Sequence, residues 1–358
     1  MGLQLKPGVV FGKQYQDLIE HCKANKFALP AVNVVGTNSV NSVLESAAQN
    51  KSDVIIQLSN GGASFFAGSG LADKNAGMVL GAVSAAQHVH LLAEAYGVCV
   101  ILHTDHANRK LLPWVSGLLD HGAKYKQQTG KPLFSSHMLD LSEEPLEDNL
   151  VECEAFLNRT AELDMSLEIE LGVTGGEEDG VGADIDEVDN AKLYTQPDEV
   201  LAAYDRLQPI GHFSVAAAFG NVHGVYKPGN VKLRPEILKD SQAKVRSTHN
   251  LSEDNPLHLV FHGGSGSEPE KISEAIDYGV FKMNIDTDTQ FAFAHGVGGY
   301  ADDHGNAFKY QIDPDTDEPL KKYYDPRKWL REGEKSMVDR LTQAFDELRS
   351  AGKSVASS

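Results

Sequence analysis

Eight short runs of apolar and β-branched residues recur along the chain, and each is followed by a stretch long enough for a helix. The runs end near Asn33, Ser59, Asp105, His137, Glu170, Gly220, His262 and Asp286. Strands that alternate with helix-sized segments favour parallel βαβ units, and eight such units favour a closed (β/α)8 barrel over an open sheet. We therefore predict an α/β fold of the TIM-barrel class.

The chain is expected to form one domain over residues 1–358, because no Pro/Gly/Ser-rich linker divides it and barrels of this class often exceed about 300 residues. The segment 295–334 is polar and too long for an ordinary connection, which indicates an extended arm that is either functional or a contact with a partner. A C-terminal helix is predicted over 335–350, where an apolar stripe falls on one face. Further helices are predicted over 37–50, 76–97, 146–163 and 268–278.

The charge balance, the cysteine content and the N-terminal sequence indicate which partners and which cell compartment to expect. The chain has 32 Lys and Arg against 51 Asp and Glu, a formal charge of −19, which disfavours nucleic acid and anionic membranes as partners. Its three cysteines include no CxxC pair, so neither a disulfide framework nor a thiolate zinc site is indicated. The start MGLQLKPGVV lacks the apolar centre of a signal peptide, and no apolar run approaches membrane length. We expect a cytoplasmic protein.

Histidines and carboxylates stand where several of the apolar runs end. Asp105 and His106 follow the third run, while Glu170, His223 and His262 end or follow the fifth, sixth and seventh runs. The carboxyl ends of barrel strands lie on the face that carries the active site. Imidazole and carboxylate groups from separate strands can converge on one divalent metal and leave a coordination position open. The pattern predicts a catalytic metal site.

The fifth run, SLEIELG, carries two carboxylates. Strand alternation directs Glu168 and Glu170 to the same side, into the barrel, where unpaired charges would be costly. Metal binding satisfies this requirement. A buried charge network without a metal is the alternative.

The segment HGGSGSEPEKI reads as a strand end, a glycine-rich turn and a helix start. Ser267 and Glu270 have the spacing of a capping box, so Gly263 and Ser265 can offer backbone N–H groups near a helix N-terminus. NIDTDTQ follows the next run, and the loops after strands seven and eight recurrently bind phosphate in barrels. A phosphate site is therefore expected here.

Six motifs, in chain order, resemble those of class II, metal-dependent fructose-1,6-bisphosphate aldolases. They are LHTDH, LEIELGVTGGEEDG, FGNVHGVYKPG, FHGGSGS, KMNIDTDTQ and YYDPRKWLR. The resemblance spans essentially the whole chain. It implies a homodimeric barrel that uses zinc to cleave fructose 1,6-bisphosphate reversibly into dihydroxyacetone phosphate and glyceraldehyde 3-phosphate, a reaction of glycolysis and gluconeogenesis.

The same resemblance implies a set of metal ligands. His106, His223 and His262 correspond to the ligands of the catalytic zinc, which stabilises an enediolate. Asp140 and Glu170 match positions of a second or alternative divalent metal. A monovalent cation is a further cofactor compatible with the family.

The resemblance also implies catalytic roles. Asp105 matches the group that exchanges a proton with the C4 hydroxyl, and its alternative role is to orient a ligand histidine. Glu178, on a glycine-flanked loop, matches the base at C1, with Glu177 as an alternative one position away. Asn284 matches a contact to the enediolate.

For substrate binding, the resemblance implies side chains and backbone groups near the sugar and its two phosphates. Arg327 would reach the second phosphate from the partner subunit. The remaining positions are Asn33, Ser59, Gly224, Gly263, Gly264, Ser265, Ile285, Asp286 and Thr287.

Other functions use some of the same residue types. Tagatose-bisphosphate aldolases differ chiefly in stereochemistry at C4, a metal-dependent hydrolase could use similar ligands, and a non-catalytic scaffold would leave the ligand set unexplained. A Schiff-base mechanism would need a lysine such as Lys227 or Lys282. The sixth run, FSVAAAFG, contains no lysine, which favours the metal.

Overall fold

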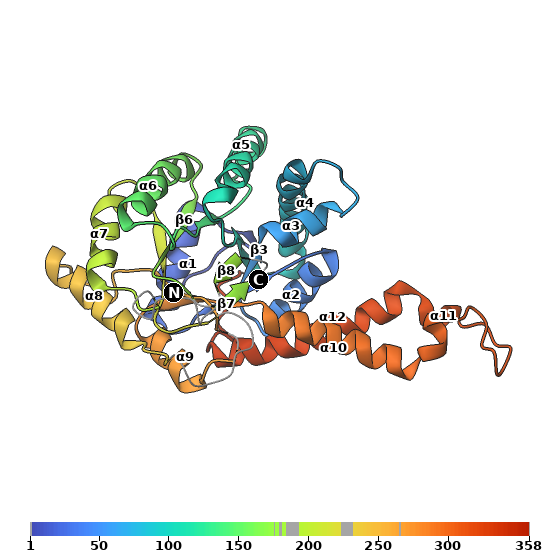
Figure 1. The fold of residues 1–358 in the computed structure, drawn as a ribbon. Coiled ribbons are helices and arrows are strands. Elements are labelled where there is room, and N and C mark those ends of the chain that lie inside the picture. The colour runs from blue at the N-terminus through green and yellow to red at the C-terminus, as the bar shows by residue number, and fades with distance from the viewer. Residues whose placement is uncertain are drawn as a thin grey trace.

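The computed structural model describes residues 2–174, 176–178, 181–183, 193–222, 232–264 and 266–357, with only the backbone of 176–178 and 181–183. Within this part of the chain, eight parallel strands close into a barrel, because β5 pairs with β4 and β11 pairs with β2 (Figure 1). The barrel strands are β2 (Leu29–Asn33), β3 (Val54–Leu58), β4 (Cys99–Thr104), β5 (Ser136–Leu139), β6 (Ser166–Leu171), β9 (Phe213–Ala217), β10 (Leu259–Phe261) and β11 (Val280–Ile285). The predicted TIM barrel is confirmed.

Within the described ranges, three further strands lie outside this ring. β1 (Gly8–Val9) pairs with the start of β4, and β7 (Gly176–Glu178) and β8 (Val181–Ala183) form a separate antiparallel pair.

Helices surround the barrel (Figure 1). Four of them, α2, α4, α6 and α9, match predicted helices within a few residues. The described helices are α1 (Gly12–Ala24), α2 (Thr37–Gln49), α3 (Asn60–Ala67), α4 (Lys74–Tyr96), α5 (Leu112–Thr129), α6 (Leu146–Glu162), α7 (Pro197–Leu207), α8 (Glu236–His249), α9 (Pro269–Asp277), α10 (Thr287–Asp303), α11 (Lys321–Tyr324) and α12 (Pro326–Glu347), with 3-10 turns at Arg109–Leu111 and Gly305–Phe308.

The C-terminal helix begins earlier than expected. It starts at Pro326 instead of near residue 335, because proline suits the first turn and the Asp325 side chain caps the helix by accepting a hydrogen bond from the Arg327 N–H. The segment 295–334, expected as a polar excursion, is largely helical. α10 and α12 pack against each other and extend away from the barrel, with α11 near the far end (Figure 1).

Two layers of apolar side chains support the barrel. One fills its interior and includes Leu29, Ile55, Ile101 and Phe281, together with residues of α1, which covers the amino end of the barrel. The other lies between the strands and the outer helices. Since apolar residues occupy the amino end, the polar groups of the interior gather toward the carboxyl ends of the strands.

α4 corrects the statement that no apolar run approaches membrane length. It has 23 residues and a mean hydropathy of 1.3 in its most apolar window, so by length and composition it could cross a membrane. A core helix of a soluble protein can have the same length and composition. In the fold it packs against α3, α5 and α2. Its glycine and alanine face, including Gly81 and Ala85, is buried there.

Gly81 is expected to be the least replaceable residue of α4. A Cβ at this position would stand 1.7 Å from the backbone oxygen of Ala63, so α3 and α4 would have to move apart. Gly81→Ala should lower the free energy of unfolding by about 3 kcal/mol or more, measured by urea denaturation. Gly77→Ala, one turn earlier in the same helix, is the control.

At Gly77 a Cβ would meet only Leu71 Cδ2, at 3.5 Å. This control should be neutral or stabilising by up to about 1 kcal/mol, because alanine has the higher helix propensity. Equal stability of the two variants would show that the close approach of α3 and α4 is not required.

Candidate metal and substrate site

Four parallel strands deliver polar side chains to the carboxyl end of the barrel. Asp105 and His106 follow β4, Asp140 follows β5, and His262 follows β10. Glu170 stands at the penultimate position of β6. Asp105, His106, Glu170 and His262 are buried, and the structure brings these four residues of the strand-end pattern into one region, together with Asp140, which the family resemblance had implied.

His106 is at the centre of this group. Its Nε2 lies 2.8 Å from Nδ1 of His262, and its Nδ1 lies 3.0 Å from Oδ2 of Asp140 and 3.5 Å from Oε2 of Glu170. The rings of the two histidines meet nearly at right angles, at 86°. His106 also has a φ of +32°, an uncommon backbone conformation for a residue with a side chain. Such strain at a buried polar cluster is a feature of functional sites.

Among the described residues, two overlapping groups could hold a metal ion. One comprises Asp105, His106 and His262, the other His106, Asp140 and Glu170, and within each group the ligand atoms lie within 4.8 Å of one another. Oε1 of Glu170 accepts a hydrogen bond of 2.7 Å from Thr174 Oγ1. Oε2 is buried and has no hydrogen-bond partner in the described part of the chain. A donor set of imidazoles and carboxylates with one such oxygen fits a divalent cation.

The pKa shifts of the carboxylates in the cluster also indicate that it could hold a cation. Burial raises the pKa of Glu170 to about 8, and the nearby negative charge of Asp140 adds to the effect. Burial acts in the same direction on Asp140, but the hydrogen bond and charge of His106 lower its pKa overall. Several carboxylates therefore compete for the positive charge of one imidazole. A divalent cation at this position would relieve their mutual repulsion.

Three amides hold the carboxylate of Asp105. Asn33 Nδ2 and Gln57 Nε2 donate to its Oδ2 at 3.2 and 2.9 Å, and Asn284 Nδ2 donates to its Oδ1 at 3.2 Å. Burial alone would raise the pKa of Asp105, but the charges of His106, Lys282 and His262 lower it to about 2. Asp105 is thus an ionised, oriented acceptor.

Gln57 was not among the predicted site residues. The sequence feature that could have identified it is a single amide inside the apolar run VIIQL. A polar side chain buried in such a run needs a hydrogen-bond partner, which marks Gln57 as a candidate site residue. Asn284 Oδ1 is also buried, with no hydrogen-bond partner among the described residues. It can accept a hydrogen bond from a bound ligand.

The expected phosphate-binding residues follow two adjacent strands. Gly263 and Gly264 follow β10, while Ile285 ends β11 and is followed by Asp286 and Thr287 at the start of α10. A Cβ at Gly264 would stand 2.6 Å from Met283 Cγ, so this turn packs closely on β11. Gly263 has a φ of +60°, which favours glycine.

Ser59 follows β3 on the same face. Its Oγ caps α3 by accepting a hydrogen bond of 3.0 Å from the Gly62 N–H.

The family model described as fructose-bisphosphate aldolase class-II matches residues 13–353 of the chain. The chain belongs to this family. It is 58% identical over 352 residues to the fructose-bisphosphate aldolase of Campylobacter jejuni, with 98% of each chain covered. It is 55% identical over 349 residues to the class 2 fructose-bisphosphate aldolase of Escherichia coli K12, with 96% of each covered. The crystal structure of the Campylobacter jejuni fructose-bisphosphate aldolase superposes with a TM-score of 0.88, at 56% identity and 98% coverage of both chains.

Family membership confirms the resemblance drawn from the six motifs, but some residues carried over from the aldolases cannot be placed. His223, Gly224 and Ser265 lie outside the described residues. For Glu178 and its alternative Glu177, the backbone belongs to β7, whereas their side chains are not described. Their roles stay predictions.

Arg327 is not part of the cluster formed by its own subunit. It lies at the start of α12, its side chain is 89% exposed, and it forms an ion pair of 2.6 Å with Asp325. Figure 1 shows this part of the arm well away from the barrel. The role that the resemblance implies for Arg327, at the second phosphate, would require the arm to reach another subunit.

Lys282, considered for a Schiff base, is engaged by Glu168. Its Nζ donates to both carboxylate oxygens, at 2.9 and 2.8 Å, deep inside the barrel. An ammonium group held in this way is not the free amine that Schiff-base formation requires. Glu168 therefore belongs to a buried charge network, while Glu170, two residues later, belongs to a group that could hold a metal.

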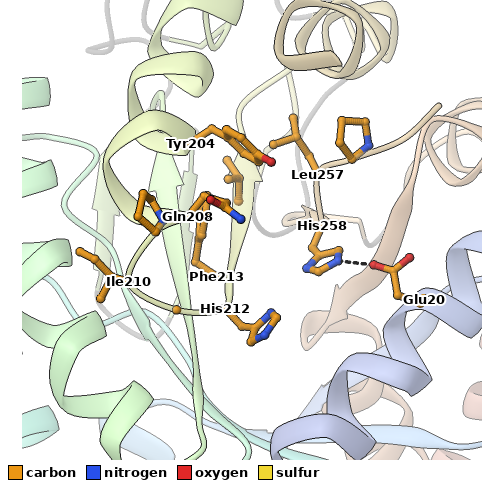
Figure 2. A pocket seen from close by; sticks show the side chains of 12 residues that line it. Glu20, Tyr204, Gln208, Ile210, His212, Phe213, Leu257 and His258 are labelled. Atoms are coloured by element: carbon orange, nitrogen blue, oxygen red, sulfur yellow. Dashed lines mark hydrogen bonds and ion pairs between the residues drawn. The ribbon is translucent and has the colours of Figure 1, made fainter. Parts of the chain in front are cut away.

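A cavity of about 350 Å³ lies at the opposite end of the barrel. Figure 2 shows Gln208 and Phe213 on one side and His258 on the other, with His258 Nε2 2.6 Å from Glu20 Oε1. Its lining includes the residues just before β9 and β10. None of the strand-end donors that the structure describes lines this cavity, which is therefore separate from the cluster around His106.

Proposed function

We propose that this chain catalyses the reversible aldol cleavage of fructose 1,6-bisphosphate into dihydroxyacetone phosphate and glyceraldehyde 3-phosphate, in the cytoplasm and within glycolysis and gluconeogenesis. The observation that carries this proposal is the carboxylate of Asp105, fixed by three amides beside the facing nitrogens of His106 and His262. The names of relatives that cover nearly the whole chain support the same reaction.

The cluster would hold a zinc ion through His106, His262 and His223. Bound there, zinc would act as a Lewis acid that polarises the carbonyl group and stabilises the enediolate. Asp140 and Glu170 would hold a second or alternative divalent metal, and a monovalent cation would complete the set of cofactors.

Asp105 would take the proton of the C4 hydroxyl during cleavage and return it during synthesis. Its pKa of about 2 keeps it ionised, and the amides of Asn33, Gln57 and Asn284 restrict its rotation. Glu178 would move the C1 proton, and Asn284 would contact the enediolate through its amide. The two acids would thus act on different carbon centres.

The phosphates would bind at two places. The turn formed by Gly263, Gly264 and Ser265, together with Ile285, Asp286 and Thr287, would enclose the triose phosphate near the start of α10. Asn33, Ser59 and Gly224 would contact the sugar. The second phosphate would meet Arg327 from the partner in a homodimer.

The decisive experiment compares cleavage of fructose and tagatose 1,6-bisphosphate by enzyme loaded with zinc alone. Faster turnover of the fructose isomer, with both triose phosphates formed in equal amounts, is the expected result. A preference for the tagatose isomer would contradict the proposed substrate, and release of inorganic phosphate without trioses would indicate hydrolysis.

The position of Arg327 leads to a prediction about mixed dimers. His106→Ala and Arg327→Ala should each be nearly inactive alone, yet subunit exchange between them should restore activity. If each site takes Arg327 from its partner, one site of the mixed dimer carries both defects and the other carries neither. Guanidinium suits this role because it can hold phosphate through two parallel hydrogen bonds.

The matched control mixes His106→Ala with His262→Ala, whose defects both lie in the barrel of their own subunit. This mixture should stay inactive because neither site is intact. Mixed Arg327→Ala dimers, verified by native mass spectrometry, that also stay inactive would place Arg327 outside the partner's site.

A further inference from the structure

The charge network beneath the site contains a buried lysine and glutamate for which the proposed reaction has no direct use. Glu168 lies two residues before Glu170 on β6, and Lys282 lies two residues before Asn284 on β11. Strand alternation therefore places both side chains inside the barrel, one layer below the site residues. Both side chains are 2% exposed.

Glu168 also contacts one of the candidate metal ligands. Its Oε1 lies 2.7 Å from Nε2 of His262, while Nδ1 of the same ring faces His106 Nε2 at 2.8 Å. A carboxylate can only accept, so the Nε2 of His262 must carry the proton in this contact. The other nitrogen, Nδ1, is then the one with a lone pair for a metal.

Lys282 keeps Glu168 in that role. Its Nζ donates to both oxygens of Glu168, which fixes the plane of the carboxylate. His103 Nε2 stands 3.5 Å from Glu168 Oε2, too far for a strong hydrogen bond, and its Nδ1 is engaged by Ser136 Oγ at 2.7 Å. Lys282 is thus the main cationic partner of Glu168 in the described part of the chain.

We propose that Lys282 and Glu168 are positioning residues, which lock His262 in the tautomer that presents Nδ1 to the metal. This inference rests on the proposed metal site, but not on the identity of the sugar. It predicts that the pair sets metal affinity even though neither residue touches the metal. Partners of this kind commonly change metal affinity by about 10- to 100-fold.

Glu168→Gln tests the tautomer directly. Lys282 would attract the amide oxygen of the new side chain, which turns its NH2 group toward Nε2 of His262. The ring would then have to accept at Nε2 and carry its proton on Nδ1, the nitrogen needed by the metal. Zinc affinity, measured without substrate by competition with a chromophoric chelator, should fall by about 10- to 100-fold.

A variant with a single unpaired buried charge can fail to fold. The double variant Glu168→Leu with Lys282→Met removes both charges and also the acceptor for the proton on Nε2 of His262, so its metal-free form should fold, as monitored by circular dichroism, and it should still lose zinc affinity. In the cobalt-loaded protein, its visible absorption bands should shift, because the geometry around the metal changes. The single variant Lys282→Arg, which keeps the charge beside Glu168, should keep most of the affinity of the unmodified protein.

The matched control is Glu20→Leu with Lys23→Met at the amino end of the barrel. Lys23 is also buried and paired with a glutamate, at 3.1 Å, but neither residue contacts a candidate metal ligand that the structure describes. This variant should bind zinc as the unmodified protein does. The proposal is overturned if the folded Glu168→Gln variant and the folded double variant bind zinc with unchanged affinity and an unchanged cobalt spectrum.

Failure of this proposal is distinguishable from failure of the proposed function. If no variant, nor the unmodified protein, binds zinc tightly, the metal site itself is wrong. If zinc binds and responds to Glu168→Gln but fructose 1,6-bisphosphate is not cleaved, only the assigned reaction is wrong.

Discussion

Chelation of the divalent metal is expected to reduce cleavage of fructose 1,6-bisphosphate by about a thousandfold or more, and zinc is expected to restore it. The expected loss of rate is this large because a Lewis acid contributes several kcal/mol to stabilising the charge that develops in the transition state. His106 and His262 face each other through ring nitrogens 2.8 Å apart, so both nitrogens are near enough to bind one cation. Rates before chelation, after it and after zinc addition are the measurement, with circular dichroism to show that the chain stays folded.

Borohydride treatment in the presence of substrate provides the counter-test. It should leave the protein active and unlabelled, since Lys282 is held by both oxygens of Glu168 and is not a free amine. Covalent labelling with inactivation would refute the metal mechanism in favour of a Schiff base.

The second large effect separates the two proposed acids. Glu178→Ala should suppress both cleavage and the exchange of the C1 proton of dihydroxyacetone phosphate with solvent, because both pass through the same enediolate. Asp105→Ala should lose cleavage by about 100- to 10,000-fold, the range for a general acid or base, yet retain measurable exchange. Its proton transfer is at the C4 hydroxyl, which the triose lacks.

Asp105 belongs to one of the groups that could hold the metal, so its substitution needs a control. Metal content should be measured for each variant, and Asp105→Asn should be compared with Asp105→Ala because it nearly preserves the shape of the side chain. Loss of exchange in a fully metal-loaded Asp105→Asn protein would contradict the division of labour between the two acids.

The barrel could be predicted because its signal is local. Each strand is a short apolar run, and its last residue or the next few carry the polar groups, so chain position alone places Asp105 and His262 on one face. Several outer helices lacked such a signal. α8, for example, buries Ser241 and Gln242 beside Ile237 and Val245, and polar residues on the buried face obscure the hydrophobic period.

Contacts between distant parts of the chain could not be predicted from spacing. Alternation placed Glu168 inside the barrel, but its partner Lys282 is 114 residues away. The same holds for Gln57, whose contact with Asp105 spans 48 residues. The arm was predicted as a polar excursion because its helices are only partly buried and therefore carry many polar residues. The packing of these helices against each other depends on glycine. A Cβ at Gly296 would stand 2.4 Å from the backbone oxygen of Glu332.

The two facing histidines differ in reach, although they are the same residue type. His106 presents Nε2, the ring nitrogen far from its backbone, whereas His262 presents Nδ1, the nitrogen near its backbone. The end of β10 can therefore stand closer to the shared point than the end of β4 does. An asparagine places a side-chain heteroatom about where Nδ1 lies, and a glutamine about where Nε2 lies. Asparagine is thus the substitution that best preserves the position of the ligand atom at residue 262, and glutamine is the one that does so at residue 106. The most conservative replacement for histidine therefore differs between the two positions.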